Sequence, residues 1–169
     1  MTPPPSSQTT PSPGTAPDQA QRPTIEGGGL RHVRQWAALR AALWPDASAE
    51  DHERELTGIL AGDHRFAAFV ALDATQRMMG FVEIALRYDY VNGCETSPVA
   101  FLEGLYVVPE QRRQGIARML CDAAMNWARA AGCTEMASDA DLNNTRSHDF
   151  HASVGFEERE RVVFFRKLL

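Results

Sequence analysis

The chain has 169 residues, about one domain at roughly 150 residues per domain. Its 17 Lys and Arg against 22 Asp and Glu give a net charge of −5, which argues against sequence-independent binding to a nucleic acid. No apolar run approaches the roughly 18 residues of a membrane span, and the N-terminus lacks a basic flank and an apolar segment. We therefore expect a soluble, cytoplasmic protein with neither a membrane nor a nucleic-acid partner.

The first 22 residues differ in composition from the rest of the chain. Seven of the ten prolines fall within the first 23 residues, among Ser, Thr and Gln, and no large apolar side chain follows Met1 there. Such a segment buries too little apolar surface to offset the entropy of ordering it. We predict a disordered Pro/Ser/Thr-rich tail at 1–22 and one folded domain at 23–169.

Apolar spacing and turn residues predict the elements of that domain. The helix after Gly29 shows apolar side chains at helical spacing, and Ser48 is a suitable N-cap for the helix that follows it. In chain order we expect a strand at 24–25, helices at 30–43 and 49–60, a hairpin of strands at 64–72 and 78–86, a strand at 99–108, a helix at 116–131, a strand at 134–138, a helix at 145–154 and a closing strand at 161–168. This alternation predicts an α/β fold with a mixed sheet.

The run 99–108 is almost continuously apolar, which is typical of a central strand covered on both faces. Glu103 is its only charged residue, and burying a lone carboxylate there would cost free energy unless the charge had a partner or a function. For the other candidate carboxylates taken singly, a solvated surface charge is the commoner explanation. Glu103 is therefore the acidic residue that the pattern singles out.

An anion site is predicted where this strand leads into the helix that begins at Ile116. The sequence there is Arg112-Arg113-Gln114-Gly115-Ile116-Ala117, an RxxGxA pattern. Free backbone N–H groups and the positive end of the helix dipole converge at such a point, and glycine lets a phosphate approach the main chain. The same pattern also occurs at helix starts that carry only an incidental arginine pair.

Together with the segment 144–156, which ends in Val154-Gly155-Phe156, this pattern resembles the GNAT superfamily of acetyl-CoA-dependent N-acetyltransferases. The resemblance covers motif A, from Ala100 through RRQGIA, and motif B. It implies a mixed, mostly antiparallel central sheet flanked by helices, with acetyl-CoA as co-substrate. The acetyl-CoA contacts that it implies are backbone groups of Leu105, Tyr106 and Val107 for pantetheine, residues Arg112, Arg113, Gln114, Gly115, Ile116 and Ala117 for pyrophosphate, and Asn144 for the pantetheine arm.

One position departs from that family. His151 stands where the family often has a tyrosine that is thought to protonate the leaving thiolate. An imidazole can donate a proton only while it is cationic, and a packed or solvated histidine without a role is the alternative. His148 and His151 lack a spaced carboxylate or thiol partner, and the three cysteines form no CxxC pair, so we expect no metal.

Several longer blocks resemble the aminoglycoside 6'-N-acetyltransferases, and together they span residues 36–165. They include LWPD at 43–46, RYDYVNG at 87–93, ETSPVAFLEG at 95–104, CTEMASDA at 133–140 and ERVVFF at 160–165. The resemblance implies acetylation of the 6'-amino group of antibiotics such as kanamycin and tobramycin, antibiotic resistance, and a homodimer. The aminoglycoside contacts that it implies are Trp44, Tyr90, Glu103, Asp139 and Glu160. A further contact would fall near Ala47, which has no polar side chain, and the Pro-rich tail is outside the family pattern.

An acidic pocket agrees with this substrate, because an aminoglycoside carries several ammonium groups. The reacting amine must lose a proton, so we hypothesise that Glu103 or Asp139 acts as general base and that the N–H near Val107 stabilises the oxyanion. Two alternatives keep the acetyl-CoA site. One is acetylation of another small amine or a protein N-terminus, and the other is a non-catalytic acyl-CoA-binding sensor.

Overall fold

A computed structural model describes residues 23–62 and 64–169, so the tail predicted at 1–22 lies outside the described residues. The elements in chain order are β1 (Thr24–Gly27), the 3-10 helix η2 (Leu30–His32), α1 (Val33–Leu43), α2 (Ala49–Leu60), β2 (Phe66–Leu72), β3 (Met78–Arg87), β4 (Val99–Val107), the 3-10 helix η3 (Pro109–Gln111), α3 (Ile116–Ala130), β5 (Met136–Ser138) and α4 (Thr145–Ser153). All of the predicted helices are present, and the strands agree to within a few residues except at the C-terminus.

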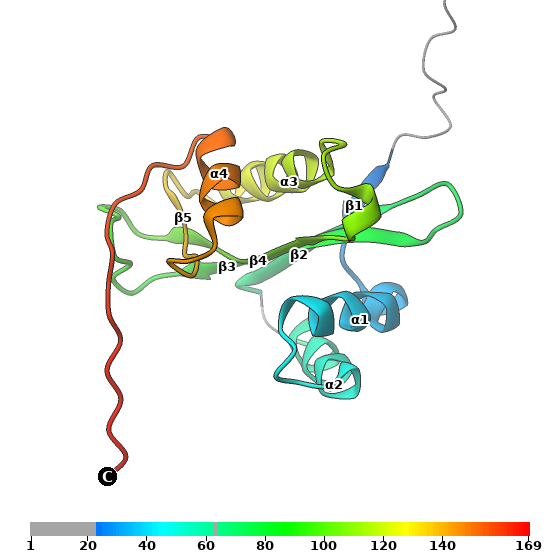
Figure 1. The fold of residues 1–169 in the computed structure, drawn as a ribbon, viewed down its shortest axis with the longest axis horizontal. Helices are drawn as coiled ribbons and strands as arrows, with labels where there is room; N and C mark the ends of the chain where they lie inside the picture. Colours follow the sequence, from blue (N-terminus) through cyan, green and yellow to red (C-terminus); the bar gives the residue numbers. More distant parts are fainter. Residues whose placement is uncertain (1–22, 63) are drawn as a thin grey trace, which may run out of the picture.

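The five strands form one sheet in the order β1-β2-β3-β4-β5. The first three pairings are antiparallel and only β4 with β5 is parallel, which confirms the predicted mixed, mostly antiparallel sheet. Figure 1 shows α3 and α4 on one face of this sheet and α1 and α2 on the other. The pair α1 and α2 lies below only part of its face, and the end of β3 and β4 next to β5 extends beyond them.

The core has a separate cluster on each face. Ile84, Leu102 and Leu120 belong to the cluster under α3, whereas Trp36 and Phe81 belong to the cluster under α1 and α2. Side chains alternate between the two faces of a strand, which is why neighbouring strand residues divide between the clusters. The strand β4, predicted to be central, lies second from the edge.

The predicted closing strand at 161–168 is wrong, because no strand is present in that segment. Figure 1 shows the chain running away from the sheet after α4 in an extended path. Phe164 and Phe165 are 87% and 94% exposed. Strand propensity alone does not make a strand, since the backbone must also pair with a free sheet edge, and this segment pairs with none of the described residues.

In the described part of the chain, no helix has the length and apolar character that crossing a membrane requires.

Candidate active site

In the second half of β4, the edge that faces β5 pairs with no other strand of the described residues. The short strand β5 pairs with β4 only from Ala100 to Leu102, and it ends at Ser138, whose hydroxyl donates to the Leu102 carbonyl at 3.3 Å. On the other side, the Val108 N–H donates to Met79 of β3 at 2.9 Å. Because backbone groups alternate in direction along a strand, the N–H of Val107 points to the open side. An extended ligand with amide groups can pair with such an edge.

At the end of this edge lies the loop that was predicted to bind an anion. Gly115 has φ of 82° and is the N-cap of α3, whose first N–H groups therefore lack intrahelical acceptors. A Cβ placed on Gly115 would meet no atom within 4 Å, so the space above this glycine is open. Arg113 also has a positive φ, of 65°. The free amides, the glycine and the helix dipole together fit a pyrophosphate.

The two arginines of the loop are placed differently. Nε of Arg112 donates to the Val107 carbonyl at 2.8 Å, and its guanidinium lies 5.5 Å from the ring centroid of Tyr106. Arg112 thus fastens the loop to the end of β4. Arg113 and Gln114 are exposed, and Ile116 is buried at the start of α3. Of the two guanidinium groups, that of Arg113 is free to approach an anion.

The sequence placed Glu103 within a buried strand, but its own side chain is not buried. It sits at a register shift in β4, between the residues paired with Glu83 and Ile84 of β3, and its side chain is 33% exposed. The extra residue of a bulge changes the direction of a side chain and leaves its backbone unpaired. The Glu103 carboxylate is paired with Arg87, whose Nη2 lies 3.0 Å from Oε1.

Asp139 directly follows β5, at the position that corresponds in register to Glu103 of β4. Leu102 pairs with Ser138 in the parallel register, so Glu103 and Asp139 each follow the last paired residue of neighbouring strands. Both acidic residues therefore follow the paired region, at the point where β4 and β5 separate. Asp139 is exposed, and so it can accept a ligand.

Trp44 follows α1 and packs against β4 beside Glu103. A Cβ on Gly104 would lie 2.5 Å from two atoms of the Trp44 ring, so only glycine permits this close approach. The Arg40 guanidinium lies 5.0 Å from the ring centroid on another side. The Trp44 carbonyl accepts a hydrogen bond from Nε2 of His52 at 3.2 Å. Trp44 is therefore held both by its ring and by its main chain.

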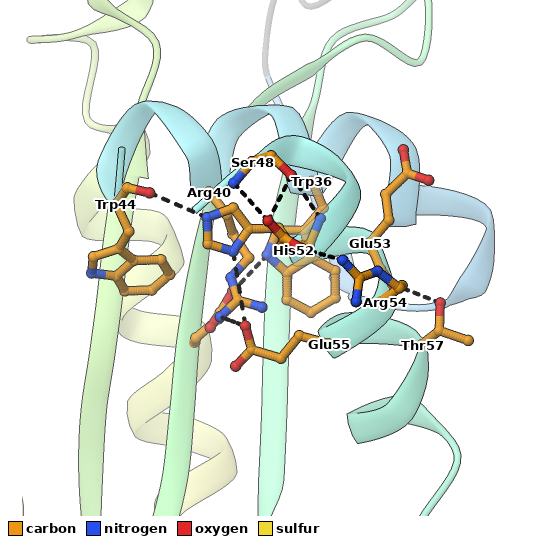
Figure 2. A network of polar contacts seen from close by, with 11 residues as sticks. Trp36, Arg40, Trp44, Ser48, His52, Glu53, Arg54, Glu55 and Thr57 are labelled. Atoms are coloured by element: carbon orange, nitrogen blue, oxygen red, sulfur yellow. Dashed lines mark hydrogen bonds and ion pairs between the residues drawn. The ribbon is translucent and has the colours of Figure 1, made fainter. Parts of the chain in front are cut away.

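A polar network beneath Trp44 joins α1 and α2 to the sheet, as Figure 2 shows. Arg40 is 5% exposed; its Nη2 lies 3.1 Å from Glu55 and its Nε lies 3.3 Å from Glu83. The indole N–H of Trp36 donates to Glu83 at 2.8 Å. Burial raises the pKa of Glu83 to about 7, although Arg40 and the Trp36 hydrogen bond both lower it. The buried carboxylate of the sheet is thus Glu83 rather than Glu103.

The loop 88–98 brings Tyr90 and Glu160 to the same end of the sheet. Glu135, just before β5, accepts hydrogen bonds from the main-chain N–H groups of Glu95 and Thr96 at 2.9 and 2.6 Å. The Thr96 hydroxyl also donates to Glu135, and this bond, followed by the main-chain bonds, lowers the pKa of Glu135. Tyr90 is 76% exposed, and Glu160 accepts from the Asn92 amide at 3.2 Å. The loop is anchored to the residue that precedes β5, while the side chain of Tyr90 is exposed.

At the start of α4, Asn144 acts as the N-cap, and its Oδ1 accepts from the Ser147 N–H at 3.2 Å. His151 lies in the same helix. Its Nδ1 is 2.7 Å from the Ser147 carbonyl, and its Nε2 is buried without a hydrogen-bond partner among the described residues. The ring packs against Phe156 at 5.1 Å between centroids. In this structure His151 is thus a packed histidine whose free nitrogen does not contact solvent.

Sequence reasoning missed the contacts that Arg40, Glu83 and Arg87 make. Glu83 stands within an apolar strand as Glu103 does, so its charge was a visible signal. Trp36 and Arg40 are four residues apart, a spacing that places both on one helix face. The pairing of Arg87 with Glu103 depends on the register between β3 and β4, which the sequence pattern did not provide.

Comparisons with known proteins agree with this geometry. Residues 33–156 match the profile described as Acetyltransferase (GNAT) family. The chain is 54% identical over 134 residues to aminoglycoside N(6')-acetyltransferase type 1 of Serratia marcescens, which covers 79% of this chain and 91% of that relative. It is 48% identical over 147 residues to the protein of the same name from Stenotrophomonas maltophilia, which covers 87% and 94%. The solved structure of AAC(6')-Iy with the bisubstrate analog CoA-S-monomethyl-acetylneamine superimposes with a TM-score of 0.81 at 42% identity, covering 87% of this chain and 99% of that one.

Proposed function

Because the chain belongs to the acetyltransferase (GNAT) family and, within it, to the aminoglycoside N(6')-acetyltransferases, we propose that it acetylates the 6'-amino group of aminoglycosides. The donor is acetyl-CoA, and tobramycin and kanamycin are representative acceptors. The observation that carries the proposal is the position of Glu103 and Asp139 beside the open edge of β4. Acetyl-CoA paired with that edge would lie close to an acceptor ammonium group held by those carboxylates.

Acidic and aromatic groups around that place suit a polycationic sugar. Glu103, Asp139 and Glu160 are acidic residues from three segments of the chain, and carboxylates bind ammonium groups through charge-assisted hydrogen bonds. Trp44 and Tyr90 provide aromatic surface beside them, and the net charge of −5 attracts a polycation. These features support an aminoglycoside over a neutral acceptor.

The reaction joins the 6'-nitrogen to the acetyl carbon and breaks the bond between that carbon and sulfur. The acceptor ammonium first loses a proton to Glu103 or Asp139, directly or through water. The neutral amine then attacks the thioester carbonyl, and the N–H of Val107 stabilises the oxyanion. The tetrahedral intermediate expels the thiolate of CoA, which takes up a proton, and the acetylated nitrogen releases its remaining excess proton. Direct transfer in a ternary complex requires no enzyme nucleophile.

The test is turnover of tobramycin with acetyl-CoA by the full chain, with the acetylated position assigned by NMR of the product. The variants E103Q and D139N then identify the base. Loss of general-base catalysis lowers kcat by about 10²- to 10⁴-fold, so we expect one of the two variants to show a loss of this size. If neither variant lowers kcat, the proton goes elsewhere.

We also propose that the protein is cytoplasmic, since acetyl-CoA is available in that compartment. We further propose that it is a homodimer. The exposed apolar run at 162–165 supports a second copy as the partner. Val163, Phe164 and Phe165 are 77%, 87% and 94% exposed, and contiguous apolar surface of this kind is typical of an interface. Sedimentation of the full chain should give a dimer, and a chain shortened after Glu160 should sediment as a monomer. A full-length monomer would overturn this part of the proposal.

A further inference from the structure

The carboxylate of Glu103 is already paired with a cation of the chain itself. Nη2 of Arg87 lies 3.0 Å from one of its oxygens and 3.2 Å from the other, so a single guanidinium nitrogen contacts both. The side chains of Arg87 and Glu103 remain 38% and 33% exposed, and so an incoming cation can reach the pair. Any ammonium group that binds Glu103 must displace Arg87 or share the carboxylate with it.

Regular structure holds Arg87 in this place. It is the last residue of β3 and pairs with Val99 of β4. Its guanidinium stacks on Phe101, with Cζ 3.4 Å from the ring centroid, and guanidinium groups are stabilised over aromatic faces. The position of Arg87 is therefore set by the sheet before any ligand binds.

Space for a different position of Arg87 lies directly beside it. An open cavity of about 510 Å³ is lined by Arg65, Ala85, Leu86, Arg87, Tyr88 and Asp89. Asp89 contributes an acidic residue to the wall of this cavity, two positions from Arg87. The cavity thus offers space for the Arg87 guanidinium away from Glu103, with one acidic residue, Asp89, and one further arginine, Arg65, in its wall.

We propose that Arg87 is a specificity-determining residue: it is the internal counter-ion of Glu103, and an ammonium group of the acceptor takes its place. This inference rests on the proposed function, because it takes Glu103 as an acceptor-binding residue. Binding is then an exchange of one cation for another on one carboxylate. An acceptor without an ammonium group at that point would break the ion pair of Arg87 with Glu103 and form no new one. The pocket therefore selects against such an acceptor. Arg87 weakens the binding of the cationic acceptor by the same exchange.

The test compares R87M, R87K and R77Q with the parent protein in steady-state kinetics with tobramycin and acetyl-CoA. R87M removes the competing charge, so we expect the KM for tobramycin to fall by about two- to fivefold, the range typical of an exposed ion pair. The KM for acetyl-CoA stays unchanged. R87K keeps a competing cation and retains a KM near that of the parent.

R77Q is the matched control for the loss of one positive charge. Arg77 is exposed and directly precedes β3, whereas Arg87 ends it, so a strand of 10 residues, roughly 30 Å long, separates them. If the change came from a general electrostatic effect, R77Q would lower the KM for tobramycin as much as R87M does. That result would overturn the inference. In an E103Q background, R87M should no longer lower the KM for tobramycin.

The outcomes separate this inference from the proposed function. No turnover of tobramycin by the parent overturns the proposed function, and the inference with it. An active parent whose R87M variant shows an unchanged or raised KM for tobramycin overturns the inference alone. Circular dichroism and thermal unfolding establish that each variant is folded, and R87Q, which keeps a polar group over Phe101, replaces R87M if the latter does not fold.

Discussion

Trp36 and Glu83 form a hydrogen bond of 2.8 Å across the buried boundary between α1 and β3. Trp36 is fully buried and Glu83 is 2% exposed, so this contact and the nearby Arg40 are what the carboxylate has in place of water. Glu83 pairs with Gly104, the residue against which Trp44 packs. The network thus supports the segment of β4 that carries Glu103 and against which Trp44 packs.

The first prediction concerns the pH dependence of stability in E83Q. The pKa of Glu83 is raised from 4.5 to about 7 in the folded chain, mainly by burial. Between these two pH values the folded state holds a proton that the unfolded state has released, so the free energy of unfolding falls as the pH rises. The stability of the parent relative to E83Q should fall by roughly 3 kcal/mol across this window and stay constant above it. Denaturant titrations at several pH values measure the difference.

E55Q is the control for this experiment, because Glu55 is the other carboxylate partner of Arg40 and its side chain is 54% exposed. An ion pair this exposed contributes about 1 kcal/mol or less to stability, so E55Q should lower the free energy of unfolding by no more than that. Parallel stability profiles for the parent and E83Q would show that Glu83 keeps an ordinary pKa in the folded protein.

The second prediction is that G104A weakens acceptor binding. Its Cβ would lie 2.5 Å from the Trp44 ring, and because the ring is packed on other sides it must move as a whole. Overpacking of this kind costs about 1–3 kcal/mol of stability. The KM for tobramycin should rise, whereas the KM for acetyl-CoA should not.

G58A is the matched control, since a Cβ on Gly58 in α2 meets nothing within 4 Å. Alanine in place of glycine within a helix should raise stability by about 0.5–1 kcal/mol and leave both KM values unchanged. Equal KM values for tobramycin in G104A and the parent would contradict the role given to Trp44.

The third prediction separates backbone strain from anion binding. Gly115 and Gly132 both have positive φ, of 82° and 86°, and a Cβ on either meets nothing within 4 Å. Replacing either glycine with alanine should therefore lower the free energy of unfolding by a similar amount, about 1 kcal/mol. Only G115A places a methyl group above the loop that faces the pyrophosphate, so only G115A should raise the KM for acetyl-CoA. Isothermal titration of acetyl-CoA into both variants provides a second readout, and equal affinities would argue against the loop as the anion site.

Much of the fold followed from local patterns. Ser48 was predicted as an N-cap, and in the structure its side chain accepts from the Asp51 N–H while the Asp51 side chain accepts in return. The helix at Ile116 and the sheet class were also predicted, since apolar spacing and turn residues are local signals. The segment 161–168 failed because pairing depends on a free partner edge, which its own residues do not specify.

The candidate site was predictable to a smaller extent. The resemblance supplied residue types, and the RxxGxA pattern supplied a physical reason for the anion loop. The exposed position of Glu103 was missed because a β-bulge leaves no mark in an apolar run. Its pairing with Arg87 was missed because it joins residues 16 positions apart through the register of two strands.

The most direct test of the proposed activity is thiol release from acetyl-CoA with tobramycin, beside a matched aminoglycoside that carries a hydroxyl in place of the 6'-amine. We predict turnover with tobramycin and none with the hydroxyl compound, which would fix both the donor and the acetylated position. Equal turnover with both would contradict acetylation of the 6'-amine. No turnover with either, despite measurable binding of acetyl-CoA, would contradict the aminoglycoside as acceptor.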